Sequence, residues 1–239
     1  MRLSVVVPCF NEENNIAPVV TQAADVGRRV ATQLEIIVVD DGSTDGTSGV
    51  LADLRLAVPE LRTISHQRNQ GYGAAIRSGF SAAQLDYVFL TDGDGQFDLR
   101  ELEGAVTLLR SHDVVAGYRA QRQDGWWRQL CGKCWTGVVN QILGLHVRDA
   151  NCAFKLLPRR LLSNVRLRSN GALISAELLF EARQRDLRIR ECAVTHYPRS
   201  TGRQSGASLR VVAVALRELV AFTMMRWDRL ARLNESPNR

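Results

Sequence analysis

The sequence lacks any uninterrupted apolar run of about 18 residues, the length that crosses a bilayer as a helix. The nearest approach, residues 211–227, carries Arg217 and Glu218 among its apolar positions. Such a segment is typical of an amphipathic helix that lies on a surface. We therefore predict that the chain is not an integral membrane protein, while peripheral binding to a membrane stays open.

Cysteine is also scarce, with five residues, an odd number. Two of them form the motif CGKC at residues 131–134, but the second pair of ligands that a zinc site needs is missing. The first four residues run straight into an apolar stretch, so no secretory leader is expected. These features predict reduced thiols that pack as small hydrophobic groups, and a cytoplasmic location.

The sequence has no fixed-period repeat and no basic stripe interleaved with aromatic residues, the pattern of many nucleic-acid-binding surfaces. A net charge of +6 and a pI near 9.4 nevertheless predict an anionic partner. The arginines cluster from Arg119 onward, while the Asp and Glu residues that are candidates for a functional site lie mostly in the first half of the chain. We expect an anionic ligand and no nucleic acid.

Short apolar stretches alternate with longer helical patterns through the first half of the chain. This alternation predicts an α/β fold: a mostly parallel sheet with helices on both faces. The length suits a single domain. Strands are expected at residues 3–7, 34–39, 61–65, 87–90, 114–116, 152–156 and 187–194, and helices at 14–30, 47–57, 72–84, 99–111, 125–143, 174–185 and 211–227.

Polar or glycine-rich turns follow each of the first four predicted strands. Ligands of mostly parallel sheets bind beyond the carboxyl ends of the strands. Four such turns in succession predict one shared site of nucleotide size. The turns read PCFNEE, DDGSTDGT, HQRNQGYG and TDGDGQ.

The fourth turn, TDGDGQFD at residues 91–98, carries the most specific pattern. Asp92 and Asp94 are two residues apart at a strand end and can converge on one divalent cation, and Gln96 adds a neutral oxygen at the next alternate position. Hard oxygen ligands of this kind suit Mg²⁺ or Mn²⁺ that shares its remaining positions with a diphosphate. The alternative is a solvated turn in which Asp98 caps the next helix.

The first turn contains Pro8, Phe10 and Glu12, which could line a binding site for a base and a ribose. The alternative for this turn is a simple helix start, with Glu12 favouring the helix dipole. Asp40 and Asp41 end the second predicted strand, and one of them can accept a hydrogen bond from a base N–H.

The third turn carries Gly71 and Gly73, which would let the backbone approach a diphosphate closely. The helix that follows would turn its positive N-terminus toward the phosphates. The alternative is a tight turn without a ligand.

The motifs VVVPCFNEE, VVDDGSTDGT, NQGYGAA, DGDGQ, DANCAFKLLPR and HYPRSTGR occur in an order that resembles the inverting family 2 glycosyltransferases of GT-A fold, in the branch of dolichol- and polyprenyl-phosphate sugar synthases. The resemblance extends from Val5 to about Ser208. It implies that Asp92, Asp94 and Gln96 are the metal ligands, and that Asp94 also takes part in catalysis. Gly95 departs from these enzymes, which often carry a larger apolar residue there.

The resemblance also implies an acceptor that is a lipid phosphate, held by Arg119, Arg128 and Arg199. Arg203 is expected to assist at the substrate. Lys155 is a further candidate, with a structural ion pair to Asp149 as its alternative.

Glu177 is the best base candidate if the acceptor is instead a hydroxyl, because a hydroxyl must lose its proton as it attacks. With a phosphate acceptor, Glu177 would orient an arginine or the donor sugar. Trp126 and Trp127 could lie at a membrane interface beside the lipid phosphate or pack in the core.

The sequence thus predicts a metal-dependent transferase that moves a sugar from a UDP- or GDP-linked donor to a polyprenyl phosphate at the cytoplasmic face of a membrane. The alternatives are a hydroxyl acceptor with Glu177 as base and, less favoured, a sugar-nucleotide nucleotidyltransferase. The predicted division is a domain at 1–208, with a donor and metal half at 1–118 and an acceptor half at 119–208, followed by an amphipathic helix and tail at 209–239.

Overall fold

The computed structural model describes residues 1–122, 125–199 and 209–234 of the chain. Its elements follow one another as β1 (Arg2–Cys9), α1 (Ile16–Val30), β2 (Gln33–Asp40), α2 (Thr47–Ala57), β3 (Leu61–Ser65), α3 (Tyr72–Ala82), β4 (Tyr87–Leu90), η1 (Leu99–Glu101), α4 (Leu102–Leu108), β5 (Val114–Arg122), α5 (Trp126–Leu143), β6 (Lys155–Pro158), α6 (Arg159–Ser163), α7 (Leu173–Arg183), β7 (Ile189–His196) and α8 (Leu209–Asn234).

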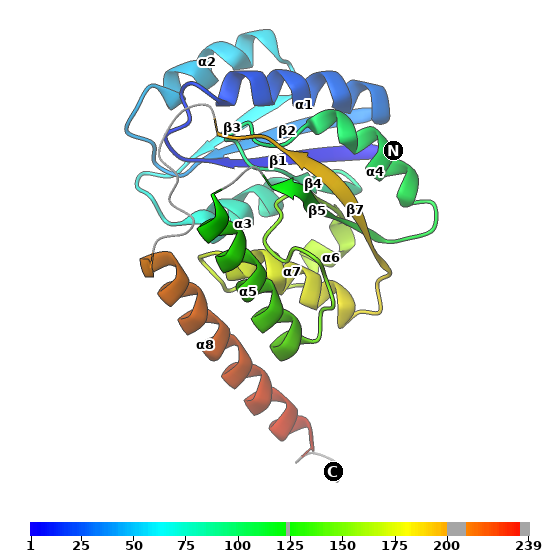
Figure 1. Cartoon of the computed structure of the whole chain (residues 1–239). Coiled ribbons are helices and arrows are strands. Elements are labelled where there is room, and N and C mark those ends of the chain that lie inside the picture. Colours follow the sequence, from blue (N-terminus) through cyan, green and yellow to red (C-terminus); the bar gives the residue numbers. More distant parts are fainter. Residues whose placement is uncertain (123–124, 200–208, 235–239) are drawn as a thin grey trace.

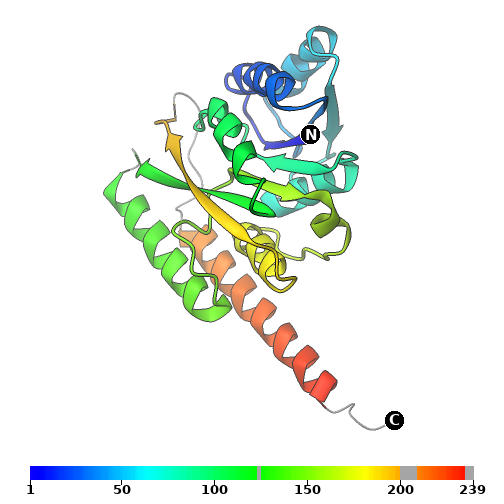
Figure 2. The ribbon, with the colours of Figure 1, turned by 90° about the vertical axis from the view of Figure 1, so that its right-hand side faces the viewer.

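Within the described residues, seven strands form one sheet in the order β3-β2-β1-β4-β6-β5-β7 (Figures 1 and 2). Strand β6 is antiparallel to both of its neighbours, β4 and β5, and every other pair is parallel. Since β6 alone is reversed, β5 and β7 run in the same direction as β1 to β4. The carboxyl ends of six strands therefore lie along one edge of the sheet.

Alternate residues of the central strands supply two separate apolar cores. Val5 and Val7 of β1 belong to the core that contains residues of α1, α2 and α4, while Val6 belongs to the core that contains residues of α3, α5, α7 and α8 on the opposite face (Figure 1). Burial on both faces explains why these strands read as continuous apolar runs rather than as an alternating pattern. The predicted α/β class, a mostly parallel sheet with helices on both faces, is confirmed.

The predicted bounds hold for the strands at 61–65 and 87–90 and fail in two places that matter for the site. The strand expected at 114–116 continues to Arg122, so Arg119 belongs to the sheet itself. The strand expected at 152–156 begins only at Lys155, because the Lys155 ammonium draws in the carbonyls of Ala150 and Cys152 and holds the preceding residues as a turn. The short helix α6 was not predicted.

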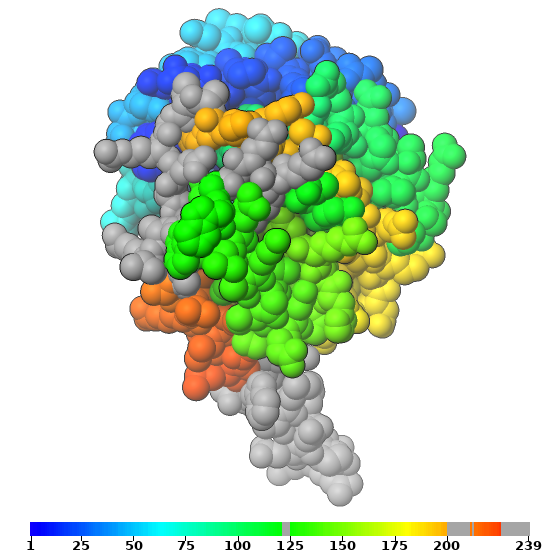
Figure 3. Space-filling model, viewed as in Figure 1, coloured from blue at the N-terminus to red at the C-terminus, as the bar shows by residue number. Residues whose placement is uncertain are grey.

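Helices α5 and α8 lie alongside one another on the same face of the sheet, and their surfaces adjoin (Figures 1, 2 and 3). Val139 of α5 and Leu219 of α8 join the same apolar core. In the part of the chain that the structure describes, no helix is both long and apolar enough to span a bilayer. Helices α5 and α8 carry large exposed apolar side chains, which are Trp126, Trp127, Leu130, Val138 and Ile142 of α5, and Val214, Leu216, Val220, Met224 and Met225 of α8.

The five cysteines all carry free thiols, but they do not share one environment. Cys9 and Cys152 are buried, as predicted for thiols that pack as small hydrophobic groups. Cys134 of the CGKC motif is exposed on α5, and Cys131 is half-buried. Core packing therefore does not explain Cys134.

Candidate active site

The turns at the common edge of the sheet form the candidate active site. The turn after β4 contributes two aspartates, and the turn after β1 contributes Glu12. Arg119 lies within β5, and Arg199 follows the end of β7. Because β5 and β7 end at the same edge as β1 and β4, acids from the first half of the chain meet arginines from the second half.

Asp92 is a partly buried carboxylate that receives a hydrogen bond from the hydroxyl of Tyr72, with 2.7 Å between the two oxygens. Burial and the neighbouring charge of Asp94 raise the pKa of Asp92 to about 7, although the Tyr72 hydrogen bond and the charges of Arg119 and Lys155 act in the opposite direction. A cation bound beside Asp92 would favour its charged form and lower this pKa.

Asp94 and Gln96 are held by the turn in which they lie. The backbone N–H of Gln96 donates to Oδ1 of Asp94 at 3.1 Å, and Gly95 between them has a φ of +72°, a conformation that favours glycine. Burial raises the pKa of Asp94 above its ordinary value, against the opposing effects of that N–H and of the charges on Arg199 and Arg128.

Gln96 is also tied to the chain after β7. Its Nε2 donates to the carbonyl of Tyr197 at 2.8 Å, and its own carbonyl accepts from the N–H of Tyr197 at 2.7 Å. The side-chain amide is thereby oriented, and no donor among the described residues is bonded to its Oε1.

These residues fit a divalent cation. Asp92, Asp94 and Gln96 offer three hard oxygen ligands, and a cation would offset the burial that raises the pKa values of both carboxyl groups and the charge of Asp94 that adds to this at Asp92. Among the described residues, no three His, Cys, Asp or Glu side chains form a cluster able to hold a metal. The protein therefore offers an incomplete ligand set of the kind that Mg²⁺ completes with water and substrate phosphates.

Arg199 joins the turns after β1 and β4. Its Nη2 is bonded to Oε1 of Glu12, and its Nη1 lies 3.9 Å from Oδ2 of Asp94. Burial raises the pKa of Glu12, while Asn15 and Arg199 act to lower it. The guanidinium, expected from the sequence at the acceptor, thus touches carboxylates of the donor side.

Arg119 forms a two-point ion pair with Asp149, with Nε to Oδ2 at 2.6 Å and Nη2 to Oδ1 at 2.9 Å. Only 13% of its side chain is exposed, so the guanidinium is held in one orientation. Asp149 therefore pairs with Arg119 and not with Lys155, whose fully buried ammonium binds backbone carbonyls instead. Arg128, at the start of α5, is half-buried and acts on the charge of Asp94.

The carboxylate of Asp41 is engaged in hydrogen bonds within the protein. Its Oδ1 accepts from the N–H of Gln70 at 2.9 Å and lies 2.6 Å from Nδ1 of His66, and its Oδ2 accepts from the N–H of Gly71 at 2.8 Å. Nε2 of His66 is 2.9 Å from Oγ of Ser78 in α3. Both carboxylate oxygens of Asp41 therefore already hold the third turn in place.

Asp40 remains as the candidate for contact with a base. Its Oδ1 accepts from the N–H of Ser43 at 2.9 Å. Within the described residues, nothing donates to its Oδ2. Of the two aspartates between which the sequence did not choose, the geometry favours Asp40.

Gly71 and Gly73 have a different reason for being glycine than the one predicted. Gly71 has a φ of +98°. A Cβ at Gly73 would lie 2.2 Å from the carbonyl oxygen of Ser169, and the N–H of Gly73 donates to the carbonyl of Asn170 at 2.8 Å. The close approach at Gly73 is thus made by residues 169–170 rather than reserved for a diphosphate.

Glu177 does not match the roles expected of it. It is buried in α7, and its two oxygens accept the N–H groups of Arg168 and Ser169 at 2.9 and 3.0 Å. A carboxylate engaged in this way neither orients an arginine side chain nor stands ready to accept a proton from a hydroxyl. Its role is to hold the backbone before α7.

Pro8, Phe10 and Arg203 complete the predicted set. Pro8 is buried within β1 beside Val39 of β2, and its contact with a base or ribose stays a prediction. Phe10 is 41% exposed and can line a ligand site. Arg203 lies outside the described residues.

Tyr72 is the functional candidate that sequence reasoning missed. It lies inside the quoted motif NQGYGAA, at the first position of α3, but its hydroxyl reaches Asp92 only because α3 packs on β1, the strand that pairs with β4. A tyrosine directly after a glycine turn at a ligand-binding edge was the available signal.

The chain is similar in sequence to a known protein family and to several characterised proteins. The model of the family described as Glycosyl transferase family 2 matches residues 4–166. Dodecaprenyl-phosphate galacturonate synthase of Rhizobium johnstonii is 32% identical over 235 residues, which cover 95% of this chain and 68% of that protein. Undecaprenyl-phosphate 4-deoxy-4-formamido-L-arabinose transferase of Aeromonas hydrophila subsp. hydrophila is 31% identical over 163 residues, covering 67% of this chain and 50% of that protein. The chain thus spans about two thirds of the first relative and about half of the second.

Among solved structures, glucosyl-3-phosphoglycerate synthase from Mycobacterium tuberculosis resembles this fold with a TM-score of 0.69 at 22% sequence identity. The match covers 94% of this chain and 79% of that one. At this identity the likeness concerns the fold alone, and the GT-A fold predicted from the sequence motifs is confirmed.

Proposed function

The chain belongs to glycosyl transferase family 2 and is a glycosyltransferase, and from this premise we propose that it moves a sugar from a UDP- or GDP-linked donor to a polyprenyl phosphate. The observation that carries the proposal is the meeting of two carboxylates of raised pKa with arginines from the other half of the chain. The relatives named for dodecaprenyl and undecaprenyl phosphate support this class of acceptor.

On the donor side, Asp92, Asp94 and Gln96 would hold Mg²⁺ or Mn²⁺, which when bound neutralises charge on the departing diphosphate. Asp40 would accept a hydrogen bond from the base, and the exposed ring of Phe10 would pack against it. The N-terminus of α3, after Gly71, would face the phosphates with its positive dipole.

On the acceptor side, Arg119, Arg128 and Arg199 would hold the lipid phosphate in line with the anomeric carbon. One phosphate oxygen forms the new bond to that carbon as the bond to the nucleoside diphosphate breaks, with inversion. A phosphate whose second ionisation lies near pH 6 is already charged at neutral pH and needs no base. This chemistry agrees with the engagement of both Glu177 oxygens by backbone N–H groups.

The exposed faces of α5 and α8 would bind the membrane that carries the acceptor. Trp126 is 74% exposed, and Met224 on α8 is 66% exposed. Amphipathic aromatic rings favour the level of the lipid headgroups, and Arg128 follows the two tryptophans directly. With five free thiols, the enzyme would work at the cytoplasmic face.

A two-stage experiment tests the proposal. UDP- and GDP-sugars are screened with Mn²⁺ for thermal stabilisation, and stabilising donors are then assayed with a short polyprenyl phosphate. The matched control is the polyprenol of the same length, which presents a hydroxyl in place of the phosphate. Transfer to the phosphate alone supports the proposal, while transfer to the alcohol at a comparable rate would overturn it.

A further inference from the structure

Residues 168–171, which precede α7, form a segment that we call the clasp. All four of its backbone N–H groups donate to just two carboxylates. The first two donate to Glu177 of α7 at 2.9 and 3.0 Å, and the last two donate to Oε1 of Glu218 at 2.8 and 2.9 Å. Glu218 belongs to α8, so the C-terminal helix holds one end of the clasp.

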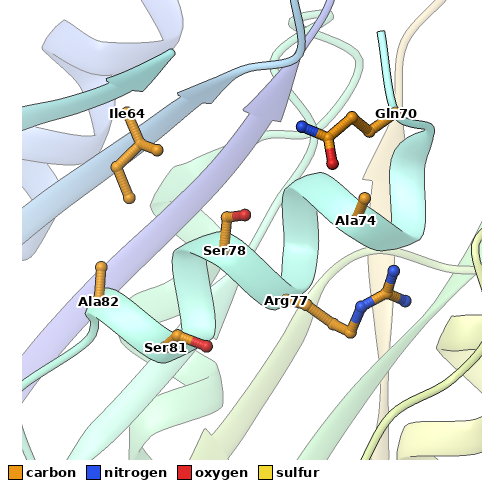
Figure 4. Close-up of a pocket in the computed structure, with 7 residues that line it drawn as sticks. All are labelled: Ile64, Gln70, Ala74, Arg77, Ser78, Ser81 and Ala82. Carbon is orange, nitrogen blue, oxygen red and sulfur yellow. The ribbon is translucent and has the colours of Figure 1, made fainter. Parts of the chain in front are cut away.

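The carbonyl groups of the clasp face α3 on the donor side of the site. Nη1 of Arg77 donates to the carbonyl of Ser169 at 2.5 Å, and Nη2 of Arg77 is bonded to the side-chain oxygen of Asn170. The carbonyl of Asn170 accepts the N–H of Gly73 at 2.8 Å. Figure 4 shows Arg77 extending from α3, where it lines a surface pocket together with Gln70 and Ala74.

The N-terminal turn of α3 in turn contacts the candidate metal ligands. Gly71 is bonded to Asp41, and Tyr72 donates to Asp92 at 2.7 Å. Hydrogen bonds therefore lead from Glu218 through the clasp to Gly73, the backbone leads from Gly73 to Tyr72, and Tyr72 reaches Asp92. A carboxylate that binds metal depends on such outer partners for its orientation.

We infer that Glu218 of α8 is a positioning residue for the metal and the donor diphosphate, acting through the clasp and Tyr72 on Asp92. The inference rests on the proposed function and deepens it, because it makes the C-terminal helix part of the donor site. Glu218 is only half-buried, and α8 is anchored through buried Ala215 and Leu219. Loss of the carboxylate therefore releases the clasp without removing an apolar contact.

A purely structural role for Glu218 makes a different prediction. Its carboxylate lies near the N-terminus of α7, where it would stabilise the helix dipole. In that case its removal lowers the melting temperature but leaves the affinity for metal and donor unchanged.

The test uses the full chain with Mn²⁺ and UDP, and in parallel Mn²⁺ and GDP, followed by calorimetry. We expect E218A to weaken binding of the nucleotide with Mn²⁺ by about tenfold, the low end for loss of an outer-shell partner of a metal ligand. E218Q keeps one acceptor oxygen and should recover part of the affinity. The neighbouring exposed Arg217 provides the control, and R217Q should bind as wild type does.

Steady-state kinetics provide the second readout. E218A should raise the KM values for donor and Mn²⁺ while leaving the acceptor KM within about twofold of wild type. R77A, which opens the clasp from α3, should reproduce this pattern, and E218A/R77A should lose less than the sum of the two single losses. R77A also keeps the inference falsifiable if E218A fails to fold.

The outcomes separate the two claims. If E218A and R77A bind Mn²⁺ and nucleotide as tightly as wild type does, the positioning role of Glu218 is wrong. The proposed function would still stand. Wild-type protein that binds neither UDP nor GDP with Mn²⁺ would overturn the proposed function and the positioning role with it.

Discussion

The carboxylates of the candidate site come from alternate positions of one short turn, at residues 92–96, whereas the three arginines come from positions spread between 119 and 199. The turn is held by its own backbone, through the N–H of Gln96 and the positive φ of Gly95. The positions of the arginines that face this turn depend on the sheet topology, because β5 and β7 must run in the same direction as β4.

The two groups also differ in how their charge is balanced. Burial raises the pKa values of Asp92 and Asp94, and the charge of Asp94 raises that of Asp92 further, so these carboxylates lack a counter-charge sufficient to keep their ordinary pKa values. Arg119, by contrast, is already paired with Asp149 at two points. The acid side thus attracts a cation, whereas the arginine side is preorganised and must share its charge with an incoming phosphate.

The largest expected effect is on the acid side. D94N should lower turnover by about 10³-fold, because the developing charge on the diphosphate loses its cation. D98N is the matched control in the same turn, since Asp98 caps η1 and pairs with Arg100. Turnover and Mn²⁺ dependence are measured for both variants. If D94N were as active as D98N, the metal assignment would be wrong.

The next largest effect should come from the arginines. R119A should lower kcat/KM for the acceptor by about 10²-fold with donor affinity little changed, and R119K should recover only part, because lysine cannot hold two phosphate oxygens in one plane. R199A should weaken donor and acceptor alike, because Arg199 contacts Glu12 and lies beside Asp94. Equal donor affinities in R199A and R119A would contradict this distinction.

A smaller effect should appear with pH. The pKa of Asp92 is raised from 3.8 to about 7, so between these values the folded protein binds a proton that the unfolded chain has released. This group therefore stabilises the metal-free fold at low pH, and its contribution is lost as the pH rises through 7. Metal binding requires the deprotonated carboxylate, so Mn²⁺ affinity should rise about fivefold from pH 6 to pH 7.

Thermal melts in chelator and Mn²⁺ titrations at both pH values check this prediction. D92N is the control, because an amide does not titrate in this range. A pH dependence of the melting temperature that survives unchanged in D92N would assign it to another group.

The smallest effect on the chemistry is expected at the membrane face. Replacing Trp126 and Trp127 together by serine should reduce the fraction that floats with anionic liposomes, while turnover on an acceptor dispersed in detergent stays near wild type. The control is L56S, which removes another highly exposed apolar side chain, on α2. Equal flotation of the two variants would argue against α5 as the membrane face.

Much of the fold could be predicted because its signals are local. Continuous apolar runs and the turns between them give the strands at 61–65 and 87–90 their observed bounds. The strand predicted at 152–156 was misplaced because a buried ammonium holds the preceding turn, an interaction between groups that the local pattern does not reveal.

The reasons for individual site residues were less predictable than their positions. Gly73 is glycine because residues 169–170, far from it in the chain, approach it closely. Glu177 accepts a backbone N–H of the same segment. Asp41 could be distinguished from Asp40 only by the hydrogen bonds it makes to the third turn. Each of these roles depends on a partner at least eight residues away along the chain.

The sequence by itself determined the α/β class, the family and the turn that carries Asp92, Asp94 and Gln96, because apolar periodicity and alternate spacing are properties of neighbouring residues. The tertiary structure decided what faces that turn. The reversal of β6 brings the ends of β5 and β7 to the same edge, and the clasp joins α8 to α3. These are contacts between residues far apart in the chain. Burial of apolar surface brings such residues together, but it is not directional, so the local pattern does not reveal which segments meet.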